Sequence, residues 1–457
     1  MFVTSEKENR FGTASKMHNN DFASKSSGWS VFISSLNVVM ILFSYQAGIC
    51  FLRPIMGDSL ETSPVAVVIR AFAFVICGIA LFFAPCHHQG QWNGFMRLLA
   101  FFWILYLIRT FYDLEIRTEY VTDQILPDRY ADYPFSFIIN GGASFPQKHL
   151  RLWLFAIPMT LFPVYTVYQT FRTIDFALAF SIARKVLTVA ALFAVFTMQI
   201  SWRDANRMDM GVLLNSISFG QFGNSIFILG MVGESGRFGK KDWCSWLLMI
   251  LGGWISLQSG SRGAVFSLGY LLLFVLIAKN RSPVKLLFKL ITLCLLLWIS
   301  GPAILELVSE FASGAVNRVV LSDPLTLLGR GEIYWRFLEK CLEYPCFGFQ
   351  TDLFGYSHNA VIDGFMMFGF IFGWINLVLI ICAIYSAFKQ IQHGVPHIWI
   401  SLLTVQFILY GMASGAFGNN PILQPLLVMC FLLFAEMQSK SKTVAETSLD
   451  FSAEKYI

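Results

Sequence analysis

Two short polar segments stand at the ends of long apolar runs, and they carry the side chains best suited to chemistry. The first is 258–263, which reads Gln-Ser-Gly-Ser-Arg-Gly, and the second is 356–359, which reads Tyr-Ser-His-Asn. Arginine and histidine are costly near lipid, so their presence beside apolar runs indicates a functional site by default. If both segments lie on one face of a membrane, they form a charged site against an apolar wall. Such a site suits chemistry on a lipid-linked anion.

The first segment has the composition of a sharp turn that could bind an anion. Gly260 and Gly263 flank Ser261 and Arg262, so the backbone can turn tightly and come close to a ligand. A helix is expected to begin directly after the turn. Its N-terminal amides and the Arg262 guanidinium would both bind phosphate oxygens. An ordinary hairpin turn between two membrane spans is the alternative interpretation.

Further arginines are expected at the same boundary between membrane and water. Arg70 and Arg109 lie near the ends of two apolar runs, whereas Arg203 and Arg207 lie in a short connection. Guanidinium groups stay charged in a low dielectric and bind phosphate in bidentate fashion. Some of these side chains could instead extend to lipid head groups. Together with Arg262, the set favours an anion site.

The second polar segment contains His358, which is expected on this face of the membrane. A histidine with an ordinary pKa near ~6.5 can accept or orient a hydroxyl proton at neutral pH. Asp363 follows at the start of the next apolar run and could orient His358 or pair with an arginine. A structural histidine whose ring bonds a backbone carbonyl is the alternative.

The residues before this histidine predict a lid. Stretch 332–344 places Phe337 and Cys341 on one apolar helical face, so an amphipathic helix is expected on the membrane surface or over the spans. A Gly-Arg-Gly sequence centred on Arg330 precedes this helix, and Pro345 ends it. The lid would deliver the histidine to the site, although a purely structural lid fits the pattern equally well.

The elements that must position these residues are membrane helices. Hydrophobic residues make up 56% of the chain and charged residues 13%, which is about half the charged fraction of soluble domains. Runs long enough to cross a bilayer recur, which predicts an all-α polytopic membrane protein with about twelve transmembrane helices. A stretch at 172–185 could instead form an interfacial helix. The expected spans are 30–52, 65–84, 96–112, 152–171, 183–201, 212–232, 244–258, 264–278, 287–305, 361–386, 398–415 and 421–436.

Lysine and arginine are more frequent in one set of short loops, which predicts that both termini are cytoplasmic. Two long loops, 113–151 and 306–358, then lie on the outer side, and the second carries the amphipathic helix. The net charge of +5 reflects this loop bias and does not indicate nucleic-acid binding. The expected organisation is a disordered tail over 1–28, a single transmembrane domain over 29–436 and a second tail over 437–457.

Several short motifs occur in the order and spacing of one known family. They are Ser-Gly-Ser-Arg-Gly-Ala at 259–264, Gly329-Arg330 with Trp335, Tyr344-Pro345 with Gly348, Ser357-His358-Asn359, and Gly369 with Gly373. A weaker match is Arg207 followed by 214–217 and Gly220. On these motifs the chain resembles the bacterial O-antigen polymerase and O-antigen ligase superfamily over 200–380. The N-terminal third carries no matching motif.

The resemblance implies a glycosyltransferase of the bacterial inner membrane that uses glycans carried on undecaprenyl diphosphate at the periplasmic face, without a metal or other cofactor. An acceptor hydroxyl would attack the anomeric carbon with inversion, and undecaprenyl diphosphate would leave. Arg262 is expected to hold the diphosphate with Arg207 and Arg203, and Arg330 would close from the lid. His358 would activate or orient the acceptor hydroxyl. The supporting candidates are Asp363, Ser261, Arg70 and Arg109.

The acceptor distinguishes a polymerase, which extends another lipid-linked repeat unit, from a ligase, which transfers the glycan to lipid A-core. The appearance of 356–359 and the chain length favour a polymerase, which could work with a chain-length regulator. A transporter or flippase for lipid-linked glycans would also need outer arginines, but internal repeats are typical of transporters and none is visible.

The sequence carries no zinc spacing or nucleotide fingerprint. Cys341 and Cys346 fall in an outer loop, where a disulfide is chemically permitted.

Overall fold

The apolar runs of this chain form helices that leave large hydrophobic side chains on the outside of the molecule. Phe82, Phe196 and Trp298 expose 83%, 83% and 78% of their surfaces. Soluble proteins rarely present so apolar an exterior, so the chain is a mostly helical membrane protein. The computed structural model describes residues 28–57, 65–84, 93–115, 157–201, 204–210, 214–233, 236, 238–239, 241–280, 282–311, 325–351, 357, 359–412, 417–418 and 420–453.

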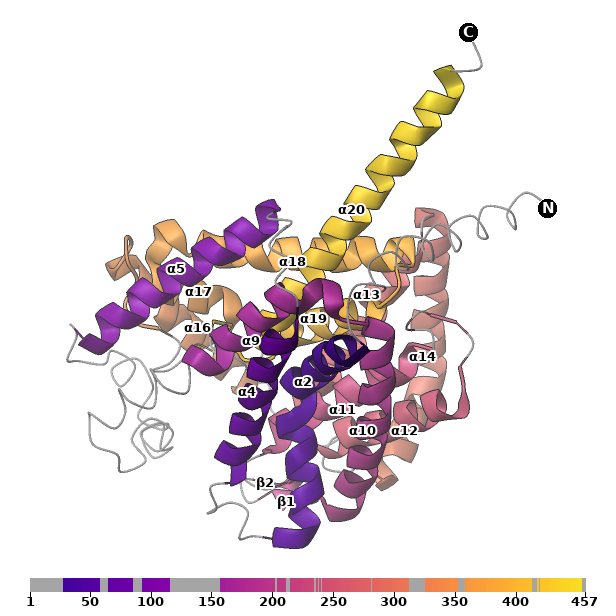
Figure 1. The fold of residues 1–457 in the computed structure, drawn as a ribbon. Helices are drawn as coiled ribbons and strands as arrows, with labels where there is room; N and C mark the ends of the chain where they lie inside the picture. The colour runs from indigo at the N-terminus through magenta and orange to yellow at the C-terminus, as the bar shows by residue number, and fades with distance from the viewer. Residues whose placement is uncertain are drawn as a thin grey trace.

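The elements follow one another along the chain as shown in Figure 1. They are α2 (Gly28–Met56), α4 (Val65–Phe83), α5 (Gly94–Glu115), α9 (Ile157–Thr170), the 3-10 helix η3 (Phe171–Thr173), α10 (Phe176–Thr197), β1 (Gln199–Ser201), β2 (Asp204–Asp209), α11 (Ser216–Met231), α12 (Trp243–Gln258), α13 (Arg262–Lys279), α14 (Pro283–Phe311), α16 (Leu325–Glu343), α17 (Ala360–Phe372), α18 (Trp374–His393), α19 (Ile398–Gly411) and α20 (Leu423–Ala453).

Among the described helices, α2, α5, α10, α13, α14 and α18 contain stretches long and apolar enough to cross a membrane. Shorter apolar stretches lie in α4, α12, α17 and α19. The twelve spans expected from the sequence therefore stay a prediction. Along its apolar stretch, none of the α14 side chains that the structure describes is buried. A helix that is apolar and exposed around its whole circumference is suited to lipid contact on every side.

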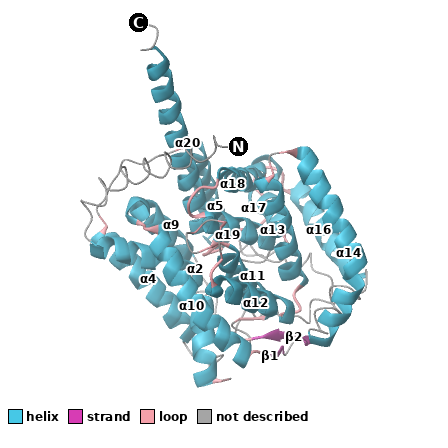
Figure 2. Ribbon diagram, turned by 90° about the vertical axis from the view of Figure 1, so that its right-hand side faces the viewer, coloured by secondary structure: helices cyan, strands magenta, loops and turns pink. Residues whose placement is uncertain are grey.

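The core of the molecule lies around α19, which the other helices surround in both views (Figures 1 and 2). Trp399 of α19 is fully buried. Aromatic rings fill the adjoining space: Phe102 of α5 lies 5.5 Å from Phe368 of α17 and 5.6 Å from Phe417, measured between ring centroids. Such edge-to-face pairs add to the packing energy of the buried area.

The expected span at 361–386 is wrong, because two helices occupy it. Gly369 adopts φ +73°, in the left-handed region that favours glycine, and the chain reverses between α17 and α18. The Asn376 amide consequently donates to the carbonyl oxygen of Ala360. In one straight helix these residues would lie about 24 Å apart along the axis. Thus α17 is a short buried helix that folds back on α18.

Two other expectations about helix bounds need correction. The Asp175 side chain accepts hydrogen bonds from Ala177 and Leu178 amides, so α10 begins at Phe176 and there is no separate helix over 172–185. The Gly-Arg-Gly sequence around Arg330 lies inside α16 rather than before it. α16 ends before Pro345, as predicted.

A short antiparallel hairpin, β1–β2, lies between two helices and was not predicted. It joins the end of α10 to the start of α11, and it lies at the end of the molecule opposite to the C-terminal end of α20 (Figures 1 and 2). α20 itself continues to Ala453, so the expected tail at 437–457 is in large part helical. The tail over 1–27 and most of loop 113–151 lie outside the described residues.

Candidate functional site

The polar turn between α12 and α13 folds on its own hydrogen bonds. Gly260 adopts φ +56°, as the expected sharp turn requires. The Ser259 hydroxyl donates to the Ser256 carbonyl oxygen at 2.7 Å and accepts from the Ser261 amide at 3.2 Å. Arg262 is the first residue of α13, and the side chain of Ser261 provides no cap for that helix. Helix N-termini favour negative charge, so Arg262 stands at a position of the fold that suits an anion.

Helix α11 holds this turn from behind. The Asn224 amide donates to the Ala264 carbonyl oxygen at 2.8 Å and to the Ser267 hydroxyl at 2.9 Å. Its oxygen accepts from the Ser256 hydroxyl at 2.8 Å, so one side chain ties α12 to α13. Asn224 is fully buried. Sequence reasoning missed this residue, although an asparagine between small residues in an apolar run is a readable signal of helix packing.

Glycines allow α11 to pack closely against α12 and the polar turn. A Cβ atom placed on Gly220 would lie 2.5 Å from the Ser259 hydroxyl oxygen and 2.6 Å from the Ala264 Cβ. Glycine at this position is therefore needed for the turn to rest on α11. Gly252 of α12 similarly meets the backbone of α11 at Phe227.

The second polar segment lies at the N-terminus of α17. The amide and the hydroxyl of Ser357 both donate to Asp363 Oδ1, each at 2.7 Å. The Asn359 side chain caps α17 by accepting from the Val361 amide at 3.0 Å. Asp363 is fully buried. His358 itself lies outside the described residues, but its two neighbours are thus fixed at the start of a buried helix.

A chain of contacts places both polar segments at one end of the same helices. Gly220, which supports the Ser259 turn, lies two residues after Ser218, whose side chain hydrogen-bonds the Tyr410 hydroxyl at the end of α19. A Cβ on the next residue, Gly411, would lie 3.4 Å from the Ala360 Cβ at the start of α17. The Arg262 turn and the α17 N-terminus therefore flank the adjoining ends of α11 and α19.

The structure describes the side chains of two of the other arginines, Arg70 and Arg109, but not those of Arg203, Arg207 and Arg330. For Arg207 in β2 and Arg330 in α16 the backbone is described and the side chains are not, and Arg203 lies outside the described residues. The hairpin that carries Arg207 leads directly into α11, so its backbone lies at the same end as the Arg262 turn. Arg70 is exposed and stacks on Tyr45 of α2, 4.5 Å from the ring centroid. Arg109 is 2% exposed and pairs with Asp113.

α16 covers the buried carboxylate of Asp363. Phe337 and Cys341 of α16 are buried, as their shared helical face predicted, whereas Trp335 is 63% exposed. Burial, reinforced by the charge of Asp363, raises the pKa of the Cys341 thiol to about 12. This thiol is therefore unreactive at neutral pH. Cys341 and Cys346 are both free, so the disulfide that the outer loop would permit does not form.

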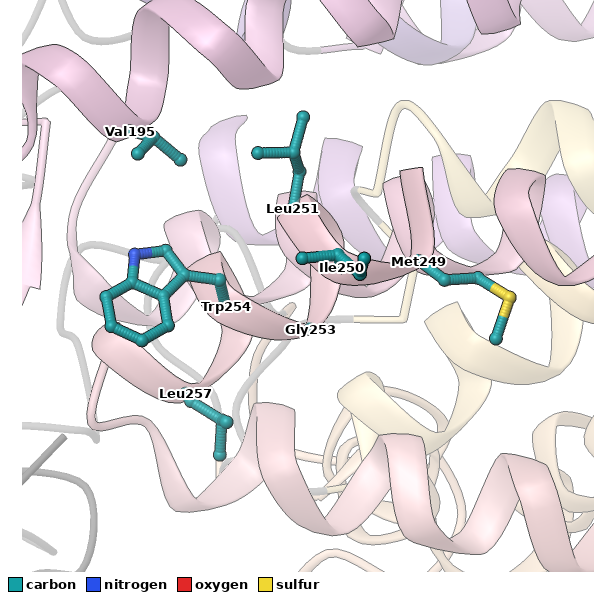
Figure 3. A pocket seen from close by; sticks show the side chains of 7 residues that line it. All are labelled: Val195, Met249, Ile250, Leu251, Gly253, Trp254 and Leu257. Carbon is teal, nitrogen blue, oxygen red and sulfur yellow. The ribbon is translucent and has the colours of Figure 1, made fainter. Parts of the chain in front are cut away.

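An apolar groove runs along α12 towards the turn (Figure 3). Val195 of α10 forms one wall, and α12 side chains including Trp254 and Leu257 form the other. Its volume is about 530 Å³. Leu257 ends the groove directly before the polar segment 258–263, so an open apolar groove and a polar turn adjoin.

Within the described residues, no group of three or more His, Cys, Asp or Glu side chains could hold a metal ion. A metal-free reaction stays a prediction. Comparisons of the chain with protein-family models, with curated proteins and with solved structures find no match.

Proposed function

We propose that this chain is an O-antigen polymerase, which joins repeat units carried on undecaprenyl diphosphate by inverting, metal-independent glycosyl transfer. One observation carries the proposal: the Arg262 turn and the N-terminus of α17 flank the adjoining ends of α11 and α19. A lipid-carrier glycosyltransferase needs this pairing, because a diphosphate and an acceptor hydroxyl must meet at one membrane face. A transporter would have no need for a histidine beside an anion site.

The donor occupies the α12–α13 side. The Arg262 guanidinium and the uncapped N-terminus of α13 bind the diphosphate. Arg207 and Arg203 add charge from the β1–β2 hairpin, and Arg330 from α16. The isoprenoid chain follows the apolar groove that ends at Leu257.

The acceptor occupies the α17 side. Its hydroxyl oxygen forms a new bond to the anomeric carbon of the donor glycan, and the hydroxyl proton passes to His358. The bond between the anomeric carbon and the diphosphate oxygen breaks, and its electron pair leaves with undecaprenyl diphosphate. Arg262 stabilises the negative charge that develops there, which is the largest catalytic effect expected in such a site.

The proposed setting is the bacterial inner membrane, with both termini in the cytoplasm and the site at the periplasmic face. The lysine and arginine bias of the short loops supports this orientation. Beyond the lipid-linked glycans and the bilayer, the proposed partner is a regulator of chain length.

The lipopolysaccharide of a deletion strain tests the proposal. A polymerase deletion leaves lipid A-core carrying one repeat unit, whereas a ligase deletion leaves bare core and accumulates lipid-linked polymer. Wild-type protein and the control Arg97→Ala, an exposed arginine in the first turn of α5, should restore the ladder of long chains. Arg262→Ala should not. An unchanged ladder in the deletion strain would refute the proposed function.

A further inference from the structure

The segment that follows α16 lies between two helices and is bonded to both. We call residues 345–351 the strap. On the α17 side, the Phe349 amide donates to the Met366 carbonyl oxygen at 2.9 Å. The Ile371 amide donates to the Pro345 carbonyl oxygen at 3.1 Å. Gly348 has φ +67° and leaves no room for a Cβ against the backbone at Met366. The strap is thus seated on the backbone of α17.

On the α5 side, two charged residues hold the same strap. Arg109 Nη1 donates to the carbonyl oxygens of Phe347 at 2.7 Å and Gly348 at 3.1 Å. Asp113 Oδ2 accepts from the Thr351 amide at 2.6 Å. The two side chains also pair with each other, with Arg109 Nε donating to Asp113 Oδ2 at 3.1 Å.

Both charges are buried, with side-chain exposures of 2% and 3%. Burying an ion pair costs desolvation energy that its attraction often fails to recover, so an apolar pair would stabilise α5 at least as well. An ion pair within one helix can also form without contacts to any other segment of the chain. What this pair adds is contact with backbone groups 238 and 239 positions away along the chain. We therefore infer that the ion pair serves to hold the strap rather than to stabilise α5.

The strap and the Ser357 segment share one stretch of α17. Asp363 holds Ser357 through its carboxylate, and Met366, three residues further on, accepts the strap amide. Residues three apart on a helix lie on neighbouring positions of one face. A shift of the strap would therefore shift the part of α17 that holds the residues beside His358.

We propose that Arg109 and Asp113 form a positioning clamp: through the strap and α17, they fix the Ser357–Asn359 segment for the acceptor. This inference rests on the proposed function and deepens it. It removes Arg109 from the residues expected to support the anion site, because its guanidinium bonds Asp113 and the strap. Neither residue touches substrate; both act through backbone groups.

Exchanging the two charged residues distinguishes a clamp on the strap from an ordinary ion pair within α5. The double variant Arg109→Asp, Asp113→Arg keeps the pair within α5. It places an anion against the strap carbonyls and a cation against the Thr351 amide, so the clamp is lost. Arg109→Lys keeps the charge but cannot bond Asp113 and both carbonyls through a planar fork. Asp113→Asn keeps an acceptor for the Thr351 amide and should be the mildest change.

Two measurements on the purified full chain then test whether Arg109 and Asp113 position the strap. Hydrogen exchange should show strap amides protected in the wild type and exposed in the charge-exchange and lysine variants, with α19 peptides unchanged. Turnover of lipid-linked repeat units should fall roughly 10–10²-fold through misplacement of the reacting groups, while the KM for the donor stays within about twofold.

Recovery of strap protection and turnover in the charge-exchange variant would overturn the clamp, since the intrahelical pair alone would then suffice. Unchanged strap exchange in Arg109→Lys would overturn it too. If the charge-exchange variant fails to fold, Arg109→Lys and Asp113→Asn carry the comparison. If the proposed function is wrong, the wild type itself will elongate no glycan. Hydrogen exchange of the strap amides would still show whether Arg109 and Asp113 hold the strap.

Discussion

Ser357 and Asp363 are joined by two hydrogen bonds to one carboxylate oxygen, from the serine amide and hydroxyl, each at 2.7 Å. Asp363 lies in the first turn of α17 and is fully buried. The pair fixes the backbone immediately before His358 relative to a rigid helix. A buried carboxylate with this arrangement acts as a local anchor for the segment that carries the proposed base.

Asp363→Ala should therefore lower turnover by roughly 10–10²-fold, since losing the anchor misplaces His358. Asp363→Asn should retain much of the activity, because the amide oxygen still accepts from Ser357. Steady-state kinetics on protein that elutes as one species in detergent would measure both effects. Equal loss in the two variants would mean that the negative charge, rather than the hydrogen bonds, is required.

Arg262→Ala should abolish polymer formation while the protein remains folded and inserted, because the leaving diphosphate loses its fixed cation. Arg262→Lys should recover only part of the activity, since an ammonium keeps the charge but not the bidentate fork. Donor binding to detergent-purified protein and elongation in membranes would measure this. Full activity in Arg262→Ala would remove the residue from the site.

Gly223→Ala should separate α11 from α12. A Cβ on Gly223 would lie 2.6 Å from the Ser256 amide nitrogen and 2.7 Å from the Gly252 carbonyl oxygen. Backbone atoms cannot yield cheaply, so the free energy of unfolding should fall by about 1–3 kcal/mol, as in other overpacked cores. The matched control is Gly253→Ala, whose nearest neighbour is a Phe227 ring carbon at 3.8 Å. Denaturant titration in mixed micelles should find the control close to wild type.

The pair between Arg184 of α10 and Asp242 at the start of α12 should give a pH-dependent stability only in acid. Burial opposes ionisation, but hydrogen bonds from Ser245 and Arg184 and the charge of Arg184 lower the pKa of Asp242 from 3.8 to about 2. A depressed carboxyl pKa contributes stability above its unfolded value and loses it as the pH falls through the folded value.

The melting-temperature gap between wild type and Asp242→Asn should therefore be constant from pH 8 to 5. It should shrink as the pH falls from 3.8 towards about 2. Thermal unfolding in detergent across this range provides the measurement. A gap that varies above pH 5 would indicate that another group controls the pair.

The sequence predicted the parts of this molecule that depend on local composition. Apolar runs marked the helices, and the glycines around Ser261 marked the turn that Gly260 makes with φ +56°. Asn359 and Asp363 were recognised as the polar start of a helix, and Pro345 as the end of another.

The features it missed depend on contacts between distant segments. Gly369 sits in an apolar run that reads equally well as one long span, and only packing against the Pro345 backbone reveals the reversal. Arg109 and Asp113 are a readable pair four residues apart, but the strap they hold is 238 positions away. Asn224 likewise acquires its role only where α11 meets α12 and α13.

The central claim is that one membrane-face site, with Arg262 on the donor side and His358 on the acceptor side, transfers glycans between lipid carriers. The most direct measurement adds undecaprenyl-diphosphate-linked repeat units to the purified chain in detergent, without an energy source or added metal. The wild type should produce longer lipid-linked glycans, and His358→Ala should be slower by roughly 10²–10⁴-fold, as expected for a lost general base. Failure of the wild type to lengthen any glycan, or full activity in His358→Ala, would contradict the account.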